Sequence, residues 1–249
     1  MKIFKAIFGR IWALWAALLF VVTMLILFIP FLMFSWFSPD PKKTNRFTRY
    51  AKVWMDVFLT LIGCPIKVKG KEHFKKGETY IVVCNHNSLM DVPVSTTRIP
   101  GGNKTIAKIE MAKTPLFGLL YRTGSVLVDR KSDTSRRESF SKMKEVLGMG
   151  LHMCIYPEGT RNKTDQPLKS FHDGAFRLAI DTKNSIIPAI IFNSKKIMPA
   201  DKSFFIWPHP LAMHFLEAVP VQPTDTVEIL KQKVFELMKN YYVANIGEW

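Results

Sequence analysis

The sequence predicts an α/β protein in which a mixed, largely parallel sheet is flanked by helices, with a hydrophobic helical membrane anchor at the N-terminus. Two observations lead to this prediction. Beyond residue 65, short apolar runs alternate with longer helix-like stretches, which is typical of a mostly parallel sheet covered on both faces. Residues 11–39 carry no charged side chain, and a membrane-spanning helix needs about 20 apolar residues. We therefore divide the 249-residue chain into an anchoring segment, 1–65, and an α/β domain, 66–249.

The apolar N-terminal run has basic residues on both sides. Because positively charged flanks tend to stay in the cytoplasm, both ends of the run are expected there. Pro30 offers a break within the run, and the amphipathic segment 50–63 offers a partner helix. We therefore favour a helical hairpin that dips into one leaflet, with a single span as the alternative. The basic residues are Lys2, Lys5 and Arg10 before the run, and Lys42, Lys43, Arg46, Arg49 and Lys52 after it.

Strands are predicted where apolar and β-branched residues gather in short runs between turn-forming residues. Gly63 and Pro65 separate the anchoring segment from the first of these runs. The predicted strands span residues 66–70, 79–85, 125–129, 151–156 and 185–192, with one or two further strands within 211–221.

Helices are predicted between several of these strands. One begins at Asp133 and ends at Gly148, because Asp favours a helix start and Gly a helix end. Asp225, with Glu228 three residues later, resembles a capping box and predicts the start of the last helix. The predicted helices span 133–148, 171–184 and 225–240, together with 111–124, which Pro115 and Gly118 interrupt.

The charge balance indicates an anionic partner. Lys and Arg number 35 and Asp and Glu 20, which gives a net charge of +15. The long apolar run favours anionic membrane lipid over nucleic acid as that partner. The three cysteines, Cys64, Cys84 and Cys154, form no CxxC spacing, so neither a zinc knuckle nor a disulfide framework is expected. We interpret Cys84 and Cys154 as small buried residues in a reducing compartment.

The stretch "VCNHNSLMDVP", residues 83–93, places His86 directly after a predicted strand and Asp91 five residues later. On one regular helix these side chains would point in different directions, so they meet only if a turn or helix start separates them. Ser88 is suited to cap such a start. Asp91 would then accept from one ring nitrogen of His86 and leave the other as a general base. A surface histidine followed by a helix-capping aspartate is the alternative.

A second polar stretch, "YPEGTRN" at residues 156–162, also follows a predicted strand. Gly159 permits close backbone approach, Thr160 offers a hydroxyl, and Arg161 carries a planar guanidinium suited to phosphate. Glu158 is expected to hold Arg161 in place. If the two strands are parallel, both polar loops open on the same edge of the sheet. A tight turn with an incidental ion pair is the alternative.

These stretches resemble the 1-acyl-sn-glycerol-3-phosphate acyltransferase family, within the wider glycerolipid acyltransferase superfamily. Four motifs occur in the family's order over about residues 66–220, together with the Lys-x-Glu stretch that precedes the second. The matching residues are Asn85, His86, Ser88 and Asp91; Lys108 and Glu110; Gly124, Asp129 and Arg130; "YPEGTRN"; and "IIPAII" around Pro188. Four motifs in order are far more specific than one.

The resemblance implies transfer of a fatty acyl group from acyl-ACP or acyl-CoA to the sn-2 hydroxyl of lysophosphatidic acid, on the cytoplasmic face of the cell membrane. It assigns catalysis to His86 and Asp91, and contact with the acyl chain or donor to Pro188. No cofactor or metal is expected beyond the thioester co-substrate. The residues expected to hold the acceptor phosphate are Glu158, Gly159, Thr160, Arg161, Lys108 and Arg130.

The sequence departs from the family pattern at Ala189, where valine is usual, and at "FHDG", residues 171–174, which replaces a more basic, lysine-containing stretch. His172 is interpreted as a loop or helix-start histidine, and His73, His152, His209 and His214 as structural or solvated. Three alternatives stay open: an acyltransferase for another lysolipid, such as a lysophospholipid or an ornithine-type lipid, a metal-dependent phosphohydrolase using His86, Asp91 and Glu158, and a membrane-binding module without catalysis.

Overall fold

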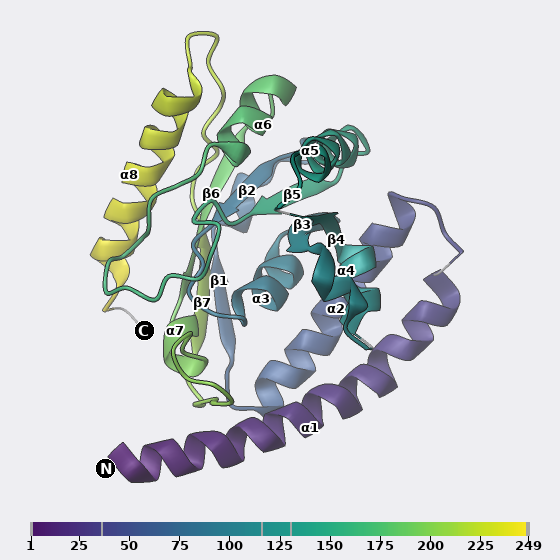
Figure 1. Cartoon of the computed structure of the whole chain (residues 1–249), viewed down its shortest axis with the longest axis vertical. Coiled ribbons are helices and arrows are strands. Elements are labelled where there is room, and N and C mark those ends of the chain that lie inside the picture. Colours follow the sequence, from purple (N-terminus) through teal and green to yellow (C-terminus); the bar gives the residue numbers. More distant parts are fainter. Residues whose placement is uncertain (1, 36, 116, 130, 248–249) are drawn as a thin grey trace.

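The computed structural model describes residues 2–247 apart from residues 36, 116 and 130. Its centre is a seven-stranded sheet in the order β1-β7-β6-β2-β5-β3-β4 (Figure 1). Every neighbouring pair is parallel except β6 and β7, which are antiparallel, so the predicted mixed, largely parallel sheet is confirmed. The strands are β1 (Ile66–Lys69), β2 (Ile81–Cys84), β3 (Asn103–Lys108), β4 (Ser125–Val128), β5 (His152–Ile155), β6 (Ile186–Phe192) and β7 (Leu211–Phe215).

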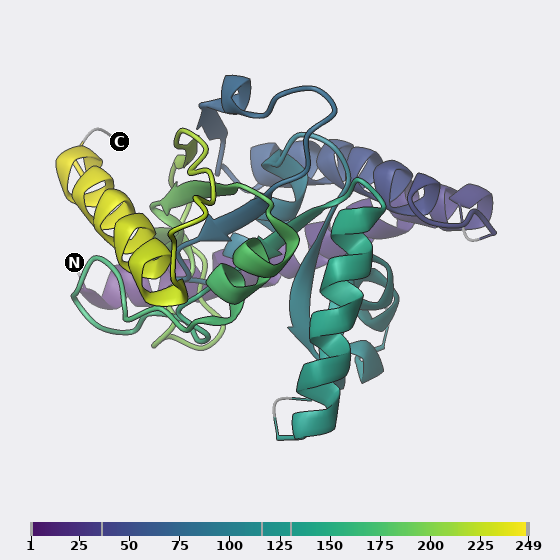
Figure 2. The same ribbon diagram turned by 90° about the horizontal axis from the view of Figure 1, so that it is seen from above.

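Helices cover both faces of the sheet, as Figures 1 and 2 show. Side chains alternate along β2: Ile81 and Val83 pack with the helices of one face, and Val82 and Cys84 with those of the other. The first face carries α5 (Asp133–Gly148), α6 (Gly174–Thr182) and α8 (Val227–Asn245). On the other face lie α1 (Lys2–Ser35), α2 (Lys42–Leu61), α3 (Asp91–Arg98) and α7 (Ser194–Ile197). The remaining helical elements are α4 (Phe117–Gly124) and the 3₁₀ turns η1 (Lys71–His73) and η2 (Ile109–Lys113).

Helix α1 continues through Pro30, so the break expected there is absent, and α1 packs against α2 as a hairpin with Phe28, Phe47 and Trp54 in a shared apolar cluster. Residues 3–31 of α1 are long and apolar enough to cross a membrane, and much of the outer surface of α1 is exposed and apolar. The inner surface of α1 belongs to the domain: Ala13 and Ala16 are buried in the same cluster as strand residues. Residues 1–65 thus share one core cluster with the sheet and supply all the buried residues of another.

A close contact ties α1 to a distant segment of the chain. The backbone N–H of Ile206 donates to the carbonyl of Gly9 at 3.0 Å. A side chain at Gly9 would collide with the ring of Phe205, so glycine is required for the segment to lie on the helix. Trp12 also donates its indole N–H to the carbonyl of Ile62, which follows α2.

Two elements of the site region were missed or only partly predicted from the sequence. Strand β3 was not expected, although it completes the sheet between β4 and β5. The helix start expected near Asp91 is a full short helix, α3. Helix α5 begins at Asp133 and ends at Gly148 as predicted, with Ser132 as its capping side chain, whereas the cap of α8 is Thr226, one residue after the predicted Asp225. Such differences of one residue at helix ends are usual.

Candidate active site

The loop after β2 is anchored by the side chain of Asn85. Its amide donates to the carbonyl of Ile191 at 3.0 Å, and its oxygen accepts the backbone N–H of Ile191 at 2.7 Å. Asn85 is fully buried, so these two bonds satisfy an amide that would otherwise be costly to bury. The pairing continues the contact between β2 and β6 by one residue and fixes the position from which His86 departs.

His86 and Asp91 form the pair that the sequence suggested. His86 Nδ1 lies 3.0 Å from Asp91 Oδ2, and the aspartate side chain is fully buried while 16% of the histidine side chain is exposed. The same oxygen accepts the backbone N–H groups of Asn87 at 2.6 Å and Ser88 at 2.7 Å. Because Asp91 Oδ2 already accepts two N–H groups, it faces Nδ1 as an acceptor too, so Nδ1 carries the ring proton and Nε2 can accept one.

The turn between the two residues is built by Ser88. Its hydroxyl accepts the backbone N–H of Met90 at 3.2 Å, directly before α3, and donates to the carbonyl of Met198 at 2.8 Å. Ser88 was expected to cap the helix, but the N-cap of α3 is Met90 and no side chain caps it, so Ser88 supports the turn before the helix. Because the N–H groups of Asn87 and Ser88 point at Asp91, they are not free to stabilise an oxyanion on a substrate.

The loop after β5 grips the backbone of His86 from both sides. Glu158 Oε1 accepts the N–H of His86 at 2.8 Å, and the N–H of Asn162 donates to the carbonyl of His86 at 2.6 Å. The second oxygen of Glu158 accepts the N–H of Lys169 at 3.1 Å. Burial raises the pKa of Glu158, while these two N–H groups partly offset the rise. Because β2 and β5 are parallel, both polar loops do leave the same edge of the sheet.

Tyr156 forms one wall beside His86. The two ring centroids lie 4.5 Å apart with an interplanar angle of 33°. The Tyr156 hydroxyl lies 2.6 Å from the hydroxyl of Ser95, which is on α3 one turn beyond Asp91. The Tyr156 ring therefore contacts His86 directly, and its hydroxyl contacts the helix that carries Asp91. Burial raises the pKa of Tyr156 well above its usual value, so the hydroxyl keeps its proton.

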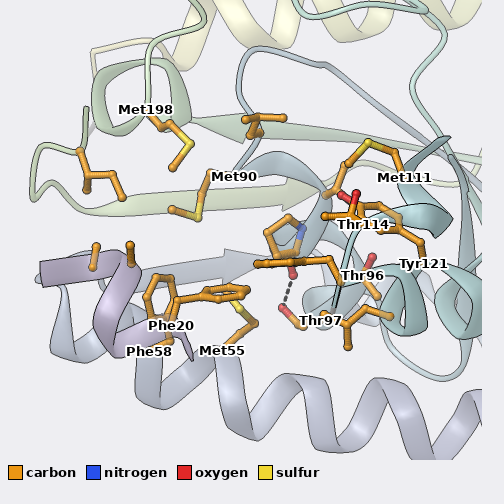
Figure 3. Close-up of a pocket in the computed structure, with 18 of the residues that line it drawn as sticks. Phe20, Met55, Phe58, Met90, Thr96, Thr97, Met111, Thr114, Tyr121 and Met198 are labelled. Carbon is orange, nitrogen blue, oxygen red and sulfur yellow. Dashed lines mark hydrogen bonds between the residues drawn. The ribbon is translucent and has the colours of Figure 1, made fainter. Parts of the chain in front are cut away.

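A cavity of about 810 Å³ reaches these loops (Figure 3). It lies among α1, α2, α3 and α4 and the segment 198–206, and its lining includes Leu89 and Met90 of the first loop and Arg161 of the second. Most of the wall is apolar, with a group of hydroxyl-bearing side chains in one part. In Figure 3 the apolar side is marked by Phe20, Met55, Phe58, Met90 and Met198, and the other by Thr96, Thr97, Thr114 and Tyr121. A cavity of this size and character suits a hydrocarbon chain.

Comparisons with known proteins identify the family. A model of the family described as Acyltransferase matches residues 65–192, which is just over half of the chain. The chain belongs to the Acyltransferase family. The matched region includes both polar loops and ends with β6. The His86–Asp91 pair and the Glu158 side chain that accepts the His86 N–H therefore lie within the region that the family model matches.

Several relatives of this acyltransferase carry a more specific name. A coconut (Cocos nucifera) protein named 1-acyl-sn-glycerol-3-phosphate acyltransferase is 30% identical over 80% of this chain and 63% of its own length. A Helicobacter pylori protein of the same name is 28% identical over 86% and 89%. The chain spans about half the length of the human alpha form. The crystal structure of PlsC, the 1-acyl-sn-glycerophosphate acyltransferase of Thermotoga maritima, superposes with a TM-score of 0.83 at 23% identity, over 98% and 99% of the two chains, which shows the shared fold.

The residues of the second loop that are expected to hold a phosphate differ in their exposure and in their contacts. Thr160 is exposed and Arg161 half-buried at the cavity, whereas the Glu158 carboxylate is buried and occupied by backbone N–H groups. The space beside Gly159 is filled by the ring of His172, which would clash with any side chain there. The φ of Gly159, +69°, also favours glycine at this position. Glu158 thus holds His86 and Lys169, not the guanidinium that it was expected to hold.

The predicted site residues outside the two polar loops lie in different parts of the chain. Lys108 is exposed at the end of β3, which neighbours β5, so it extends the same edge of the sheet. Arg130 lies outside the described residues. Pro188 is buried in the middle of β6, paired with Val83, and is not among the residues that line the large cavity. The contact with the acyl chain predicted for Pro188 is therefore not made through this cavity.

Sequence reasoning missed three contributors to the acyltransferase site. These are Ser95, Asn162 and Lys169, and each acts through a contact with a residue distant in the sequence or through a folded loop. Only Asn162 lay within a motif that drew attention. The phosphohydrolase alternative required Glu158 to join His86 and Asp91 as a ligand. The oxygens of Glu158 instead face backbone N–H groups, and the described part of the chain contains no cluster of three His, Cys, Asp or Glu side chains placed to hold a metal ion.

Proposed function

We propose that the protein transfers a fatty acyl group from an acyl thioester, acyl-ACP or acyl-CoA, to the sn-2 hydroxyl of 1-acyl-sn-glycerol-3-phosphate, giving phosphatidic acid. The observation that carries the proposal is the His86–Asp91 pair, 3.0 Å apart, in a loop whose Leu89 and Met90 line a large apolar cavity. A general base beside a hydrocarbon-sized cavity fits an alcohol acceptor and a fatty acyl donor. The names of the relatives support the same acceptor.

The chemistry follows from the orientation of the imidazole. Asp91 holds the proton on Nδ1, so Nε2 takes the proton of the acceptor hydroxyl as its oxygen attacks the thioester carbonyl. The new C–O bond forms, the tetrahedral intermediate collapses, and the C–S bond breaks. The imidazolium then returns the proton to the departing thiolate. No covalent acyl-enzyme is needed, because a thiolate is already a good leaving group.

Substrate binding is divided between the cavity and the second loop. The cavity takes a fatty acyl chain, and Arg161 at its lining binds the acceptor phosphate through its planar guanidinium. Thr160, beside Arg161, offers a hydroxyl to the same phosphate, and Lys108 adds a positive charge along the sheet edge. In this proposal the charged head group lies outside the apolar cavity and the reacting hydroxyl lies near His86.

The membrane holds the acceptor, so the site must lie at its surface. The exposed apolar side of α1 enters one leaflet as part of the hairpin with α2, at the cytoplasmic face where the thioester arrives. Basic residues near both helices attract anionic lipid, each contributing about 1 kcal/mol close to the surface. Residues 1–65 therefore act as the membrane anchor in this proposal and also form part of the cavity wall.

The decisive experiment is an acyl-transfer assay with the purified full chain in mixed micelles. Labelled acyl-CoA and acyl-ACP are each offered with lysophosphatidic acid, other lysophospholipids and a lyso-ornithine lipid, with His86→Ala as the control. We expect phosphatidic acid to form fastest and the control to be inactive. Transfer to a different lysolipid with none to lysophosphatidic acid would replace the acceptor in the proposal. Absence of transfer to every acceptor would refute it.

A further inference from the structure

The loop that follows Arg161 folds back over the turn formed by residues 158–161. Lys169 donates its backbone N–H to Glu158 Oε2 at 3.1 Å, and His172 donates its backbone N–H to the carbonyl of Pro157 at 2.8 Å. The other oxygen of Glu158 accepts the N–H of His86. One buried carboxylate therefore bridges the backbone of Lys169 and the backbone of the general base, which fixes their relative positions.

The side chain of Lys169 extends along the exposed side of the same turn. Its Nζ donates to the hydroxyl of Thr160 at 2.6 Å. Four other lysines, Lys52, Lys104, Lys144 and Lys231, have their ammonium groups within 3 Å of a carboxylate oxygen. Within the described part of the chain, Lys169 forms no such ion pair, and an ammonium group has three N–H donors. Its charge is thus available to a ligand beside Thr160.

The neighbouring sequence explains why a lysine is useful at this position. Lys169 is followed three and four residues later by His172 and Asp173. The His172 ring packs against Gly159, and Asp173 pairs with Lys231 of α8, so neither replaces a lysine on the exposed side of the turn. Lys169, a few residues earlier, brings a cation to that side.

We propose that Lys169 is a phosphate-binding residue of this site, acting with Thr160 and Arg161 on the acceptor head group. Arg161 lines the cavity, and the adjacent residue of the turn, the exposed Thr160, contacts Lys169, so in this proposal the phosphate binds between a guanidinium and an ammonium group. The contact between Lys169 and Thr160 orders both side chains before the ligand arrives, which reduces the entropy lost on binding. This inference rests on the proposed function for its ligand.

Two measurements on the full-length protein test the role of Lys169. The first is equilibrium binding of short-chain lysophosphatidic acid, below its micelle concentration and without a donor. The second is the kinetics of acyl transfer to the same acceptor. The variants are Lys169→Met, which removes the charge and nearly keeps the length, Lys169→Arg, which restores a cation, and Lys163→Met, which removes an exposed lysine from the same loop.

We expect Lys169→Met to raise both Kd and KM for the acceptor about tenfold, since a charge-assisted hydrogen bond to the phosphate is lost. The value of kcat should stay within about threefold, Lys169→Arg should recover most of the affinity, and Lys163→Met should match wild type. Equal Kd values for wild type and Lys169→Met, or equal losses in Lys169→Met and Lys163→Met, would overturn the assignment. If wild type binds the acceptor but does not acylate it, the proposed function fails while the binding data still decide the role of Lys169.

Discussion

The backbone N–H of His86 donates to the carboxylate of Glu158 at 2.8 Å, so the proposed general base is held by a side chain from the loop after β5. Glu158→Gln keeps one acceptor oxygen but points an N–H₂ group at a backbone N–H. We expect kcat to fall about tenfold to a hundredfold and stability to fall by about 1–3 kcal/mol, because a buried donor loses its acceptor. Acyl-transfer kinetics and urea unfolding check both values. Glu138→Gln on α5, an exposed position, is the control, and unchanged kcat in Glu158→Gln would contradict the positioning role.

Asp91→Asn tests the tautomer of the histidine. The amide offers either an N–H₂ group or a neutral oxygen to Nδ1 and to the two backbone N–H groups, so Nε2 is no longer reliably the base. Loss of a comparable aspartate lowers kcat by about 10⁴ in a serine protease, and we expect at least a hundredfold loss here. Adding His86→Ala to Asp91→Asn should cost little more than His86→Ala alone, because residues that act as a unit are not additive. Additive losses in the double variant would show that the two residues act separately.

Arg161 offers a test of phosphate geometry. Arg161→Lys keeps the charge but loses the planar pair of donors, whereas Arg161→Ala loses both. We expect KM for lysophosphatidic acid to rise in both variants, and more in Arg161→Ala, with kcat less affected. The measurement is initial rate against acceptor concentration at a saturating donor level. An unchanged KM in both variants would show that Arg161 does not contact the phosphate.

His152 should make stability depend on pH. Its Nδ1 accepts the backbone N–H of Tyr80 at 3.0 Å, and burial lowers its pKa from 6.5 to about 4. In the unfolded chain the His152 ring is therefore protonated below about pH 6.5, whereas in the folded protein it is protonated only below about pH 4. The folded state is then fully favoured above pH 6.5 and loses stability as the pH falls toward 4.

Urea unfolding at pH 7 and pH 4.5 measures this loss. At one pKa unit per 1.36 kcal/mol, we expect His152 to account for about 2–3 kcal/mol of it. His152→Gln retains an acceptor for Tyr80 without a titrating ring, so its loss should be smaller by that amount. Equal losses in the two proteins would place the acid sensitivity elsewhere, for example in the carboxylates whose pKa is lowered by lysine partners, Asp40 and Asp173.

Cysteine labelling decides how the N-terminal helices sit in the membrane. Cys64, Cys84 and Cys154 are fully buried, so single Cys residues introduced by Lys5→Cys and Lys42→Cys give a clean signal. For the hairpin in one leaflet, neither position reacts with an impermeant maleimide added outside intact cells, and both react after lysis. Labelling of Lys5→Cys alone from outside would show that α1 spans the bilayer.

The sheet and the His86–Asp91 contact could be predicted because their signals are local. The apolar run 79–85 and the five-residue spacing of His86 and Asp91 each lie within one short stretch. Strand β3 gave a weaker signal, because its buried positions carry Asn103 and Thr105 alongside Ala107, and two of its other positions carry lysines. Its strand conformation is imposed by pairing with β4 and β5 on both sides.

The contacts that complete the site could not be predicted, because they depend on how distant loops fold together. Glu158 was expected to pair with Arg161, three residues away, yet it faces His86, which is 72 positions away in the sequence. A Glu-x-x-Arg pattern fits an ion pair as well as a backbone clamp. The path of the loop formed by residues 162–172 decides which of these two contacts Glu158 makes. The spacing of residues in that loop does not predict this path.

The small side chains of α1 give the N-terminal helix a second role. Ala13, Ala16 and Ala17 line the large cavity, while Ile11, Leu14 and Leu18 on the same turns are exposed. In the proposed orientation, a single helix thus separates a bound fatty chain from the surrounding lipid. The bilayer would then act as an outer support of the substrate site, so lateral pressure and lipid thickness would influence how firmly that wall is held. Extraction into detergent would support this helix less firmly than the bilayer does and would alter the range of fatty acyl chains that the cavity accepts.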